Sequence, residues 1–175
     1  MSGTILLVAG PPGAGKSTVA QLVAQSFKRS VHIHTDDFYA WIARGYVEPW
    51  KAESLTQNLV IADAIAVAAN RFSTGGYDVA VDGVLGLWSL GPWHALGRPV
   101  SYALLLPDVA AARRRAAERG EHPLKDLDVV SQMHAAFVAH LDGFEHHVID
   151  STHLSPEDTA VEVRRRLDAG ELRLR

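Results

Sequence analysis

The fold of this chain is decided by the stretch Gly10-Pro11-Pro12-Gly13-Ala14-Gly15-Lys16-Ser17. The stretch fills every fixed position of the pattern G-x-x-x-x-G-K-[S/T], which is the phosphate-binding P-loop. An apolar run, residues 4–9, precedes it, and residues 18–27 follow it with apolar side chains at helical spacing. The motif requires a strand, a glycine-rich turn and a helix in this order, so its context is also met.

The chemistry of the motif follows from its geometry. Glycines let the backbone wrap closely around a phosphate, where a side chain would collide with it. The N–H groups of the loop and the positive end of the following helix favour an anion. Lys16 is expected to reach the β- and γ-phosphates, and the Ser17 hydroxyl to ligate Mg²⁺. Residues Gly10 to Thr18 are therefore the expected nucleotide-binding segment, with ATP and Mg²⁺ as cofactors.

Composition restricts the class of protein. The 175 residues correspond to about one domain, and 47% hydrophobic residues suffice for a core. The net charge of −3 gives no support for a nucleic-acid surface. The absence of cysteine excludes disulfides, thiolate metal sites and cysteine nucleophiles. No segment reads as a secretion signal or a membrane span, so we expect a cytoplasmic protein, monomeric or homodimeric.

Strands alternate with helices along the whole chain. The expected strands are continuous apolar runs, which is typical of a parallel sheet that is covered on both faces. They lie at residues 4–9, 31–34, 77–82, 100–106 and 147–150, and the expected helices at 18–27, 51–72, 108–119, 128–141 and 156–169. The pattern predicts an α/β fold of three layers, α/β/α, in a single domain over residues 1–175. Ligands of such sheets bind at the carboxyl ends of the strands.

The long helix at 51–72 has small and apolar residues at steps of three and four. The spacing predicts one buried face, made of Leu55, Leu59, Ala62, Ala66 and Ala69. The next apolar run begins only after Gly75 and Gly76, which mark the end of this helix.

Acidic residues follow two of the expected strands at the ligand end. Asp36 and Asp37 come after the second strand, where one carboxylate accepts the proton of an attacking hydroxyl and the other holds Mg²⁺. The alternative is a pair of N-cap residues for a short helix beginning at Phe38. Asp82 ends the third strand, the place of a Walker-B acid that holds Mg²⁺, or else forms an Asp-Gly turn with Gly83. Whether Asp37 or Asp82 is the main Mg²⁺ partner stays open.

Basic side chains are grouped on one expected helix. Arg115 and Arg119 lie four residues apart, hence on one face, and can stabilise charge on a transferring phosphoryl group. The alternative is a solvated basic face, which we expect for Arg113 and Arg114. Nine histidines show no metal-binding spacing, and we interpret them as surface or strand-end residues.

Aromatic residues are concentrated in the two segments after the second and third strands. Trp41, Trp88 and Trp93 belong to these segments, at the ligand end of the sheet. A place in the core and a place in an acceptor pocket are both open for these tryptophans. Residues 40–50, which include Arg44, are irregular in pattern and read as the wall or cover of a pocket.

At this point the motifs resemble a known group of enzymes. The P-loop, Thr35 to Phe38, Val81-Asp82, the Arg115 to Gly120 segment and Ile149 to His153 occur in the order and spacing of small P-loop kinases. The chain most resembles chloramphenicol phosphotransferase-like proteins within the adenylate-kinase-like group. Its Asp-Asp-Phe-Tyr stretch also resembles nicotinamide riboside and uridine kinases. The resemblance covers nearly the whole chain.

The resemblance implies more than the residues alone indicate. It implies a five-stranded parallel sheet of the P-loop NTPase type in the order 2-3-1-4-5, with a short lid at about 115–128 that carries the arginines. It implies phosphoryl transfer from ATP to a hydroxyl, with Asp36 as the base. It also implies that the loop after the last strand packs near adenine, which assigns Ser151, Thr152 and His153 to the nucleotide. The acceptor segments, 40–50 and 85–98, differ from those of the antibiotic kinase.

The sequence therefore predicts an ATP- and Mg²⁺-dependent kinase of a small hydroxylated molecule. The expected acceptor is a nucleoside, sugar or antibiotic-like molecule, because residues 38–98 contain few arginines and lysines. The expected catalytic residues are Lys16, Asp36, Arg115 and Arg119, and the expected acceptor-binding residues are Asp36, Phe38, Trp41, Arg44 and Trp88. The alternatives are a nucleotide kinase, a non-catalytic nucleotide-binding regulatory module, and a toxin-like kinase acting on a cell-wall sugar nucleotide.

Overall fold

A five-stranded sheet lies at the centre of the computed structural model, which describes residues 2–118 and 126–174. Its strands pair in parallel in the order β2-β3-β1-β4-β5. They are β1 (Ile5–Ala9), β2 (Ser30–His34), β3 (Asp78–Gly83), β4 (Ser101–Leu105) and β5 (Val148–Ile149). This arrangement confirms the expected α/β class and the strand order.

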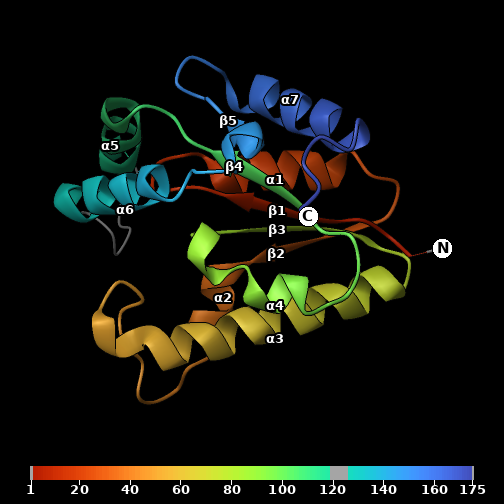
Figure 1. Cartoon of the computed structure of the whole chain (residues 1–175), viewed down its shortest axis with the longest axis horizontal. Helices are drawn as coiled ribbons and strands as arrows, with labels where there is room; N and C mark the ends of the chain where they lie inside the picture. The colour runs from red at the N-terminus through yellow and green to blue at the C-terminus, as the bar shows by residue number, and fades with distance from the viewer. Residues whose placement is uncertain (1, 119–125, 175) are drawn as a thin grey trace.

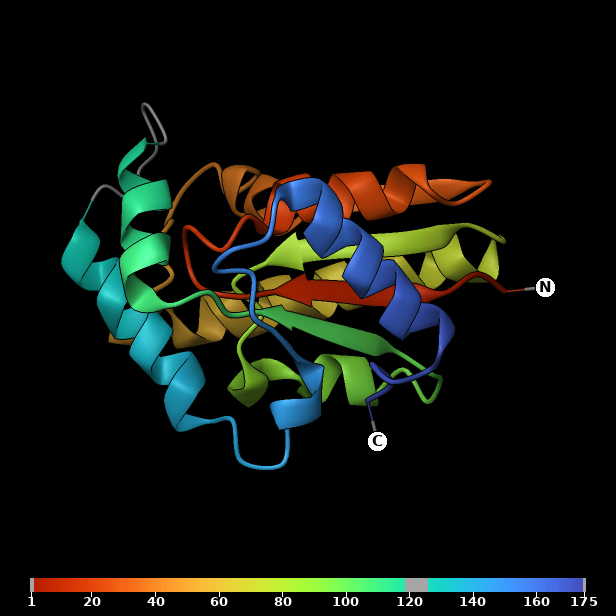
Figure 2. The ribbon, with the colours of Figure 1, turned by 90° about the horizontal axis from the view of Figure 1, so that it is seen from above.

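Helices cover both faces of the sheet and its carboxyl end. Figures 1 and 2 show α1 and α7 on one face, α2, α3 and α4 on the other, and α5 and α6 beyond the ends of the strands. The α-helices are α1 (Lys16–Gln25), α2 (Thr35–Ala40), α3 (Leu55–Thr74), α4 (Gly91–His94), α5 (Val109–Glu118), α6 (Leu127–Ala139) and α7 (Pro156–Asp168). Short 3-10 turns are η1 (Ala52–Ser54), η2 (Leu87–Ser89) and η3 (Glu145–His147).

The central strand β1 is buried on both faces, as its apolar sequence predicts. Alternate side chains of a strand point to opposite faces. Ile5 and Leu7 accordingly belong to the core cluster on the α3 face, whereas Leu6 and Val8 belong to the cluster beneath α1 and α7. Each face of the sheet therefore has its own apolar core, and the two cores hold the strand ends and their loops in fixed positions.

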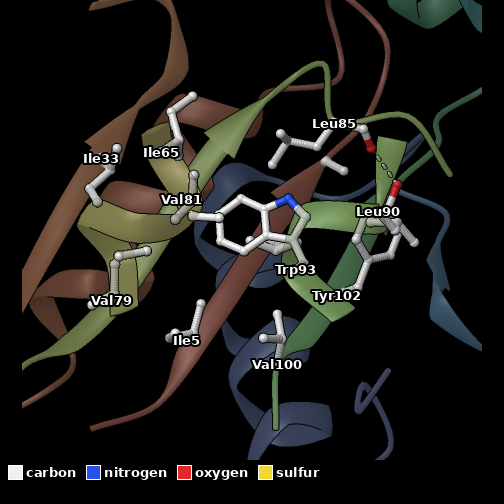
Figure 3. Packing of buried hydrophobic residues seen from close by; sticks show 14 of the residues in the cluster. Ile5, Ile33, Ile65, Val79, Val81, Leu85, Leu90, Trp93, Val100 and Tyr102 are labelled. Carbon is white, nitrogen blue, oxygen red and sulfur yellow. Dashed lines mark hydrogen bonds between the residues drawn. The ribbon is translucent and has the colours of Figure 1, made fainter. Parts of the chain in front are cut away.

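The core on the α3 face surrounds Trp93, which is 1% exposed (Figure 3). Of the two places that the sequence left open for Trp93, the core and an acceptor pocket, the structure shows the core. Beside it, the Tyr102 hydroxyl donates a hydrogen bond to the carbonyl of Leu85 at 2.7 Å. This buried bond ties the segment that follows β3 to the neighbouring part of β4.

Helix α3 packs on the sheet over only part of its length. The buried residues of the helix include Ile61, Ile65 and Ala69, whereas Leu55 and Leu59 are 65% and 52% exposed. The prediction that Leu55 and Leu59 belong to the buried face is therefore wrong. Figure 1 shows the reason, because the N-terminal turns of α3 extend past the carboxyl ends of the strands. Periodicity identifies the helix but not the point where it leaves the sheet.

No helix in the described part of the chain is long and apolar enough to span a membrane. Half of the lid expected at 115–128, residues 119–125, lies outside the described residues, and Arg119 is among them.

Candidate functional site

The P-loop connects β1 to α1 and depends on three glycines with positive φ. Gly10, Gly13 and Gly15 have φ values of 149°, 82° and 86°, in the region that side chains other than glycine rarely adopt. A Cβ atom at Gly13 would also collide with the carbonyl of Ala112, and one at Gly10 with the carbonyl of Leu105. The loop is therefore packed closely against β4 and α5 while its backbone keeps the conformation that the motif requires.

Helix α1 begins at the end of this loop, and its first turn suits an anion. Lys16 is the first residue of the helix, and the first turn contains no acidic side chain. The Lys16 Nζ atom donates a hydrogen bond to the carbonyl of Pro11 at 2.9 Å, which keeps the ammonium folded over the loop. Helix N-termini of this kind combine N–H donors with a favourable dipole. The residues present thus fit the phosphates of a nucleotide.

Ser17, on the first turn of α1, meets Asp82 at the end of β3. The Ser17 hydroxyl donates a hydrogen bond to Asp82 Oδ2 at 2.6 Å, and the carboxylate is fully buried. Mg²⁺ is usually held by one or two carboxylates together with substrate phosphates, and a hydroxyl next to a carboxylate supplies such oxygen donors. The pair therefore fits a magnesium ion that is bound together with a nucleotide. Asp37, the other candidate ligand, is exposed in the first turn of α2.

Two histidines hold the same carboxylate from the neighbouring strand. His34 pairs with Asp82 in the parallel register of β2 and β3, and His32 lies two residues earlier on the same face. His32 Nε2 lies 2.6 Å from Asp82 Oδ1, and His34 Nδ1 lies 2.9 Å from Asp82 Oδ2. Burial alone would raise the pKa of Asp82, but the hydrogen bonds from both histidines and from Ser17 hold it well below its ordinary range. Asp82 is thus a buried, fixed anion.

His34 also reaches Asp36, the expected catalytic base. Its Nε2 atom lies 3.4 Å from Asp36 Oδ2, on the ring edge opposite to the contact with Asp82. Hydrogen bonds with Asp36 and then Asp82 raise the pKa of His34 from 6.5 to about 10, although burial opposes the shift. The protonated imidazole therefore lies between two carboxylates. The Asp36 carboxylate is 61% exposed and remains accessible to a substrate.

The start of α2 is placed by a close contact with the end of β3. A Cβ atom at Gly83 would collide with the side chain of Thr35, the first residue of α2. The absence of a side chain at Gly83 lets α2 begin directly at the ligand end of the sheet. Asp36, the second residue of that helix, is thereby held near the His34 ring, which also contacts Asp82. Asp82 and Gly83 both belong to β3, so the alternative of an Asp-Gly turn is wrong.

Two arginines of α5 contact segments that are distant in the sequence. Arg115 donates hydrogen bonds from one nitrogen to the carbonyls of Ser151 and Thr152, at 2.8 and 3.1 Å. These carbonyls belong to the loop that the resemblance assigns to adenine. Arg113 donates hydrogen bonds to the Leu127 carbonyl and to the Ser131 hydroxyl, and so connects α5 to α6. The expectation that Arg113 is merely solvated is wrong.

The loop after β5, residues 151–153, is held by hydrogen bonds. The Thr152 backbone N–H donates to Asp150 Oδ1 at 2.9 Å, and the Thr152 hydroxyl accepts from the Asp108 N–H at 2.8 Å. Ser151 is buried, and its hydroxyl has no hydrogen-bond partner within the described part of the structure. His153, the third residue expected to contact the nucleotide, is exposed.

A cavity of about 590 Å³ adjoins Asp36 between α2, α3 and the segment after β3. It is lined by Thr35, Asp36, Tyr39, Ala40, Ile42, Tyr46, Pro49, Trp50, Asn58, Ile61, Ala62, Ile65, Val84, Leu85, Trp88 and Ser89. Two of the expected acceptor-binding residues, Asp36 and Trp88, thus line the cavity. Phe38, Trp41 and Arg44 do not. Phe38 packs against the core with its ring tilted against that of Trp41, which is 70% exposed, and Arg44 is exposed as well.

Sequence reasoning missed several residues that the fold brings to the site. The contacts of His32 and His34 with Asp82 follow from the register of β2 on β3. They could not be predicted, because a single sequence does not show which strands pair. Tyr39 and Asn58 line the cavity from two different helices. The one available signal was the position of Tyr39 four residues after Thr35, on the same side of a helix.

The comparisons with known proteins agree with this geometry. The family model described as Zeta toxin matches residues 2–136. The chain belongs to the Zeta toxin family. The match includes the P-loop, β2, α2 and β3, and hence the elements that carry Lys16, Asp36 and Asp82. No curated protein matches the sequence.

Solved structures with this fold include several small-molecule kinases. A sugar kinase from a Janibacter species has a TM-score of 0.73 at 19% identity, with 95% of each chain covered. Shikimate kinase from Acinetobacter baumannii, in complex with shikimate, has a TM-score of 0.70 at 17% identity, covering 97% of this chain and 96% of the other. The tunicamycin resistance protein of Deinococcus radiodurans has a TM-score of 0.67 at 16% identity, covering 95% and 96%. At these identities the similarity shows the shared P-loop kinase fold.

The geometry of the loop leads to a first prediction. Gly13→Ala combines a strained φ with a collision at the Ala112 carbonyl, so the loop must open. We expect the affinity for Mg²⁺·ATP, measured by isothermal titration calorimetry, to fall by at least about tenfold, which corresponds to about 1.4 kcal/mol. Gly91→Ala is the matched control, since a Cβ there meets nothing within 4 Å. Unchanged ATP affinity in Gly13→Ala would contradict the assignment of this loop to phosphate binding.

Proposed function

We propose that the protein is an ATP-dependent phosphotransferase, formed by a single kinase domain, that moves the γ-phosphate to a hydroxyl group of a small molecule. One observation carries the proposal. The Asp36 carboxylate lies at the edge of an acceptor-sized cavity and, through the His34 ring, next to the Ser17–Asp82 pair. A base, a metal site and a phosphate loop thus converge at the carboxyl end of one sheet, where ligands of such sheets bind.

The proposed roles follow from position. The P-loop N–H groups and Lys16 hold the phosphates, and Asp36 orients the acceptor hydroxyl and takes its proton. Phosphoryl transfer demands mainly positioning and charge stabilisation from the protein. The exposed carboxylate of Asp36 suits this role, because a base must lie within hydrogen-bond distance of the hydroxyl.

Magnesium is the proposed metal cofactor, with Ser17 and Asp82 as the residues that hold it. When bound, the ion would neutralise negative charge on the phosphates during transfer. Asp82 suits the role better than Asp37, because Asp82 is buried, ionised and 2.6 Å from the Ser17 hydroxyl. The two histidines keep the carboxylate oriented, as outer partners of metal ligands commonly do.

The arginines of the proposed lid divide into two groups. Arg115 holds the loop at Ser151 and Thr152, which supports a role in shaping the nucleotide-binding side of the site. Arg119 lies outside the described residues, and its proposed role remains charge stabilisation on the transferring group. The main role proposed for Arg115 is therefore in nucleotide binding. Stabilising charge in the transition state is its secondary role.

Two alternatives fit the site less well. A nucleotide kinase needs cations for the phosphate of its acceptor, and no described arginine, lysine or histidine lines the cavity. A regulatory module without transfer activity has no use for an exposed carboxylate between a cavity and a phosphate loop. Both remain testable by the activity of the purified protein.

The role of Asp36 gives the second prediction. Asp36→Asn preserves the size of the side chain but removes the base, so Mg²⁺·ATP affinity should stay the same while transfer falls by about 10²–10⁴-fold. The measurement is ADP release with a metabolite library as acceptors, next to ATP titration. Asp37→Asn serves as the matched control, since it changes the adjacent exposed carboxylate. Full transfer activity in Asp36→Asn would remove Asp36 from its assigned role.

A second candidate function is favoured by the family match. The model that matches residues 2–136 is described as Zeta toxin, which favours a kinase whose activity harms the cell that produces it. The same catalytic residues would serve this function, and only the acceptor would differ. A sugar nucleotide of the cell wall is the acceptor that this candidate requires.

Toxicity tests this candidate and gives the third prediction. If the protein is a toxin, induced expression in a bacterial host should reduce growth, and Asp36→Asn should restore it, because the variant keeps the fold but loses transfer. Viable counts after induction are the measurement, with equal protein levels verified on a gel. Normal growth with wild-type protein, or equal toxicity of Asp36→Asn, would contradict a toxic kinase activity.

A further inference from the structure

The cavity next to Asp36 is almost devoid of charge. Among its described lining residues, Asp36 alone carries a charged side chain, and no arginine, lysine or histidine is present. Most of the others are aliphatic or aromatic. A bound phosphate or carboxylate would therefore lie next to a carboxylate, with no cation from the described lining to offset its loss of water.

Three polar lining residues already bind other parts of the protein. The Tyr39 hydroxyl donates to Asn58 Oδ1 at 3.1 Å, and Asn58 Nδ2 donates to the Pro49 carbonyl and to Ser54 Oγ, at 2.8 and 2.9 Å. The Ser89 hydroxyl donates to the Gly86 carbonyl at 2.7 Å. These bonds use both donor hydrogens of Asn58 and the hydroxyl protons of Tyr39 and Ser89. The side-chain donors that are left for a ligand are those of Thr35, Tyr46, Trp50 and Trp88, in an otherwise apolar lining.

The mouth of the cavity exposes a group of apolar side chains. Tyr46, Trp50, Val84 and Trp88 all line the cavity and are between 37% and 53% exposed. An exposed cluster of this kind is a common mark of a ligand site, because covering it removes apolar surface from water. The observation concerns surface exposure and is independent of the missing cations.

The inner wall of the cavity is part of the rigid core. Ile65 and Leu85 line the cavity and also pack around Trp93 (Figure 3). The Leu85 carbonyl is held by the Tyr102 hydroxyl, as Figure 3 shows. Interiors packed in this way do not rearrange easily. The apolar character of this wall is therefore built into the fold.

We propose that the acceptor of this kinase is an uncharged alcohol with a mainly apolar, preferably aromatic, body. Its hydroxyl lies at Asp36, and its body lies against Ile61, Ile65, Leu85 and Trp88. Nucleotides, sugar nucleotides, sugar acids and sugars rich in hydroxyls are poor acceptors for this cavity. The inference rests on the proposed function and names the substrate class for the same site.

Binding of matched probes tests the substrate class without requiring transfer. The probes are 2-(2-naphthyl)ethanol, its phosphate monoester, glucose, and the sugar nucleotide UDP-N-acetylglucosamine, added to full-length protein saturated with Mg²⁺·ADP. Backbone ¹H–¹⁵N NMR shifts of cavity residues give the affinities. We expect the naphthyl alcohol to bind at least about tenfold more tightly than each other probe, a ratio typical of apolar pockets.

Variants assign the binding to this cavity. Trp88→Ala should weaken binding of the naphthyl alcohol about tenfold and leave Mg²⁺·ADP affinity unchanged, whereas Phe72→Ala removes an exposed aromatic ring outside the cavity and should change neither. Val84→Lys adds a cation to the lining and should raise the affinity for the phosphate monoester. Because Val84→Lys leaves the Trp88 side chain in place, its result does not depend on whether Trp88→Ala disturbs the packing of the cavity.

Each outcome decides the inference. Tighter binding of the phosphate monoester, glucose or the sugar nucleotide would overturn it, and so would the absence of cavity shifts with the naphthyl alcohol at millimolar concentration. A naphthyl alcohol that binds as expected but is never phosphorylated would leave the binding class standing and count against the proposed transfer. Failure of the substrate class and failure of the proposed function are thus distinguishable.

Discussion

The site depends on the hydrogen bond between Ser17 and Asp82. It joins the first turn of α1 to the end of β3 at 2.6 Å, and so connects the helix that faces the phosphates to the strand that carries the acid. The buried carboxylate would be costly without partners. Ser17, His32 and His34 supply these partners, and all three come from elements that pack against β3. The candidate metal site is therefore part of the packing of the sheet.

The same constraint places the remaining parts of the site. His34 follows from the register of β2 on β3, and Asp36 follows from the start of α2 next to Gly83. Asp36 in turn lies at the mouth of a cavity whose inner wall is the core around Trp93. Phosphate loop, metal site, base and acceptor cavity thus form one connected structure. Within this arrangement, the chemistry of the cavity lining decides which molecules can use the base.

Much of the fold was predictable, and the site only in part. The P-loop motif and the continuous apolar strands predict the parallel sheet, because local sequence determines both. The buried face of α3 was predicted incorrectly at Leu55 and Leu59, since periodicity does not show where a helix leaves the sheet. The contacts of His32 and His34 depend on strand register, and those of Arg113 and Arg115 on how α5 packs. Such long-range contacts leave no mark in a single sequence.

The most direct test of the central claim is electron paramagnetic resonance of Mn²⁺ in place of Mg²⁺. The claim is that Ser17 and Asp82 hold a divalent ion together with the nucleotide phosphates. Mn²⁺ should bind the wild-type protein in the presence of a non-hydrolysable ATP analogue. The Mn²⁺ affinity, determined from the signal of the bound ion, should be at least about tenfold lower in Ser17→Ala. Equal Mn²⁺ affinity in wild type and Ser17→Ala, or no bound Mn²⁺ in the wild-type complex, would contradict the claim.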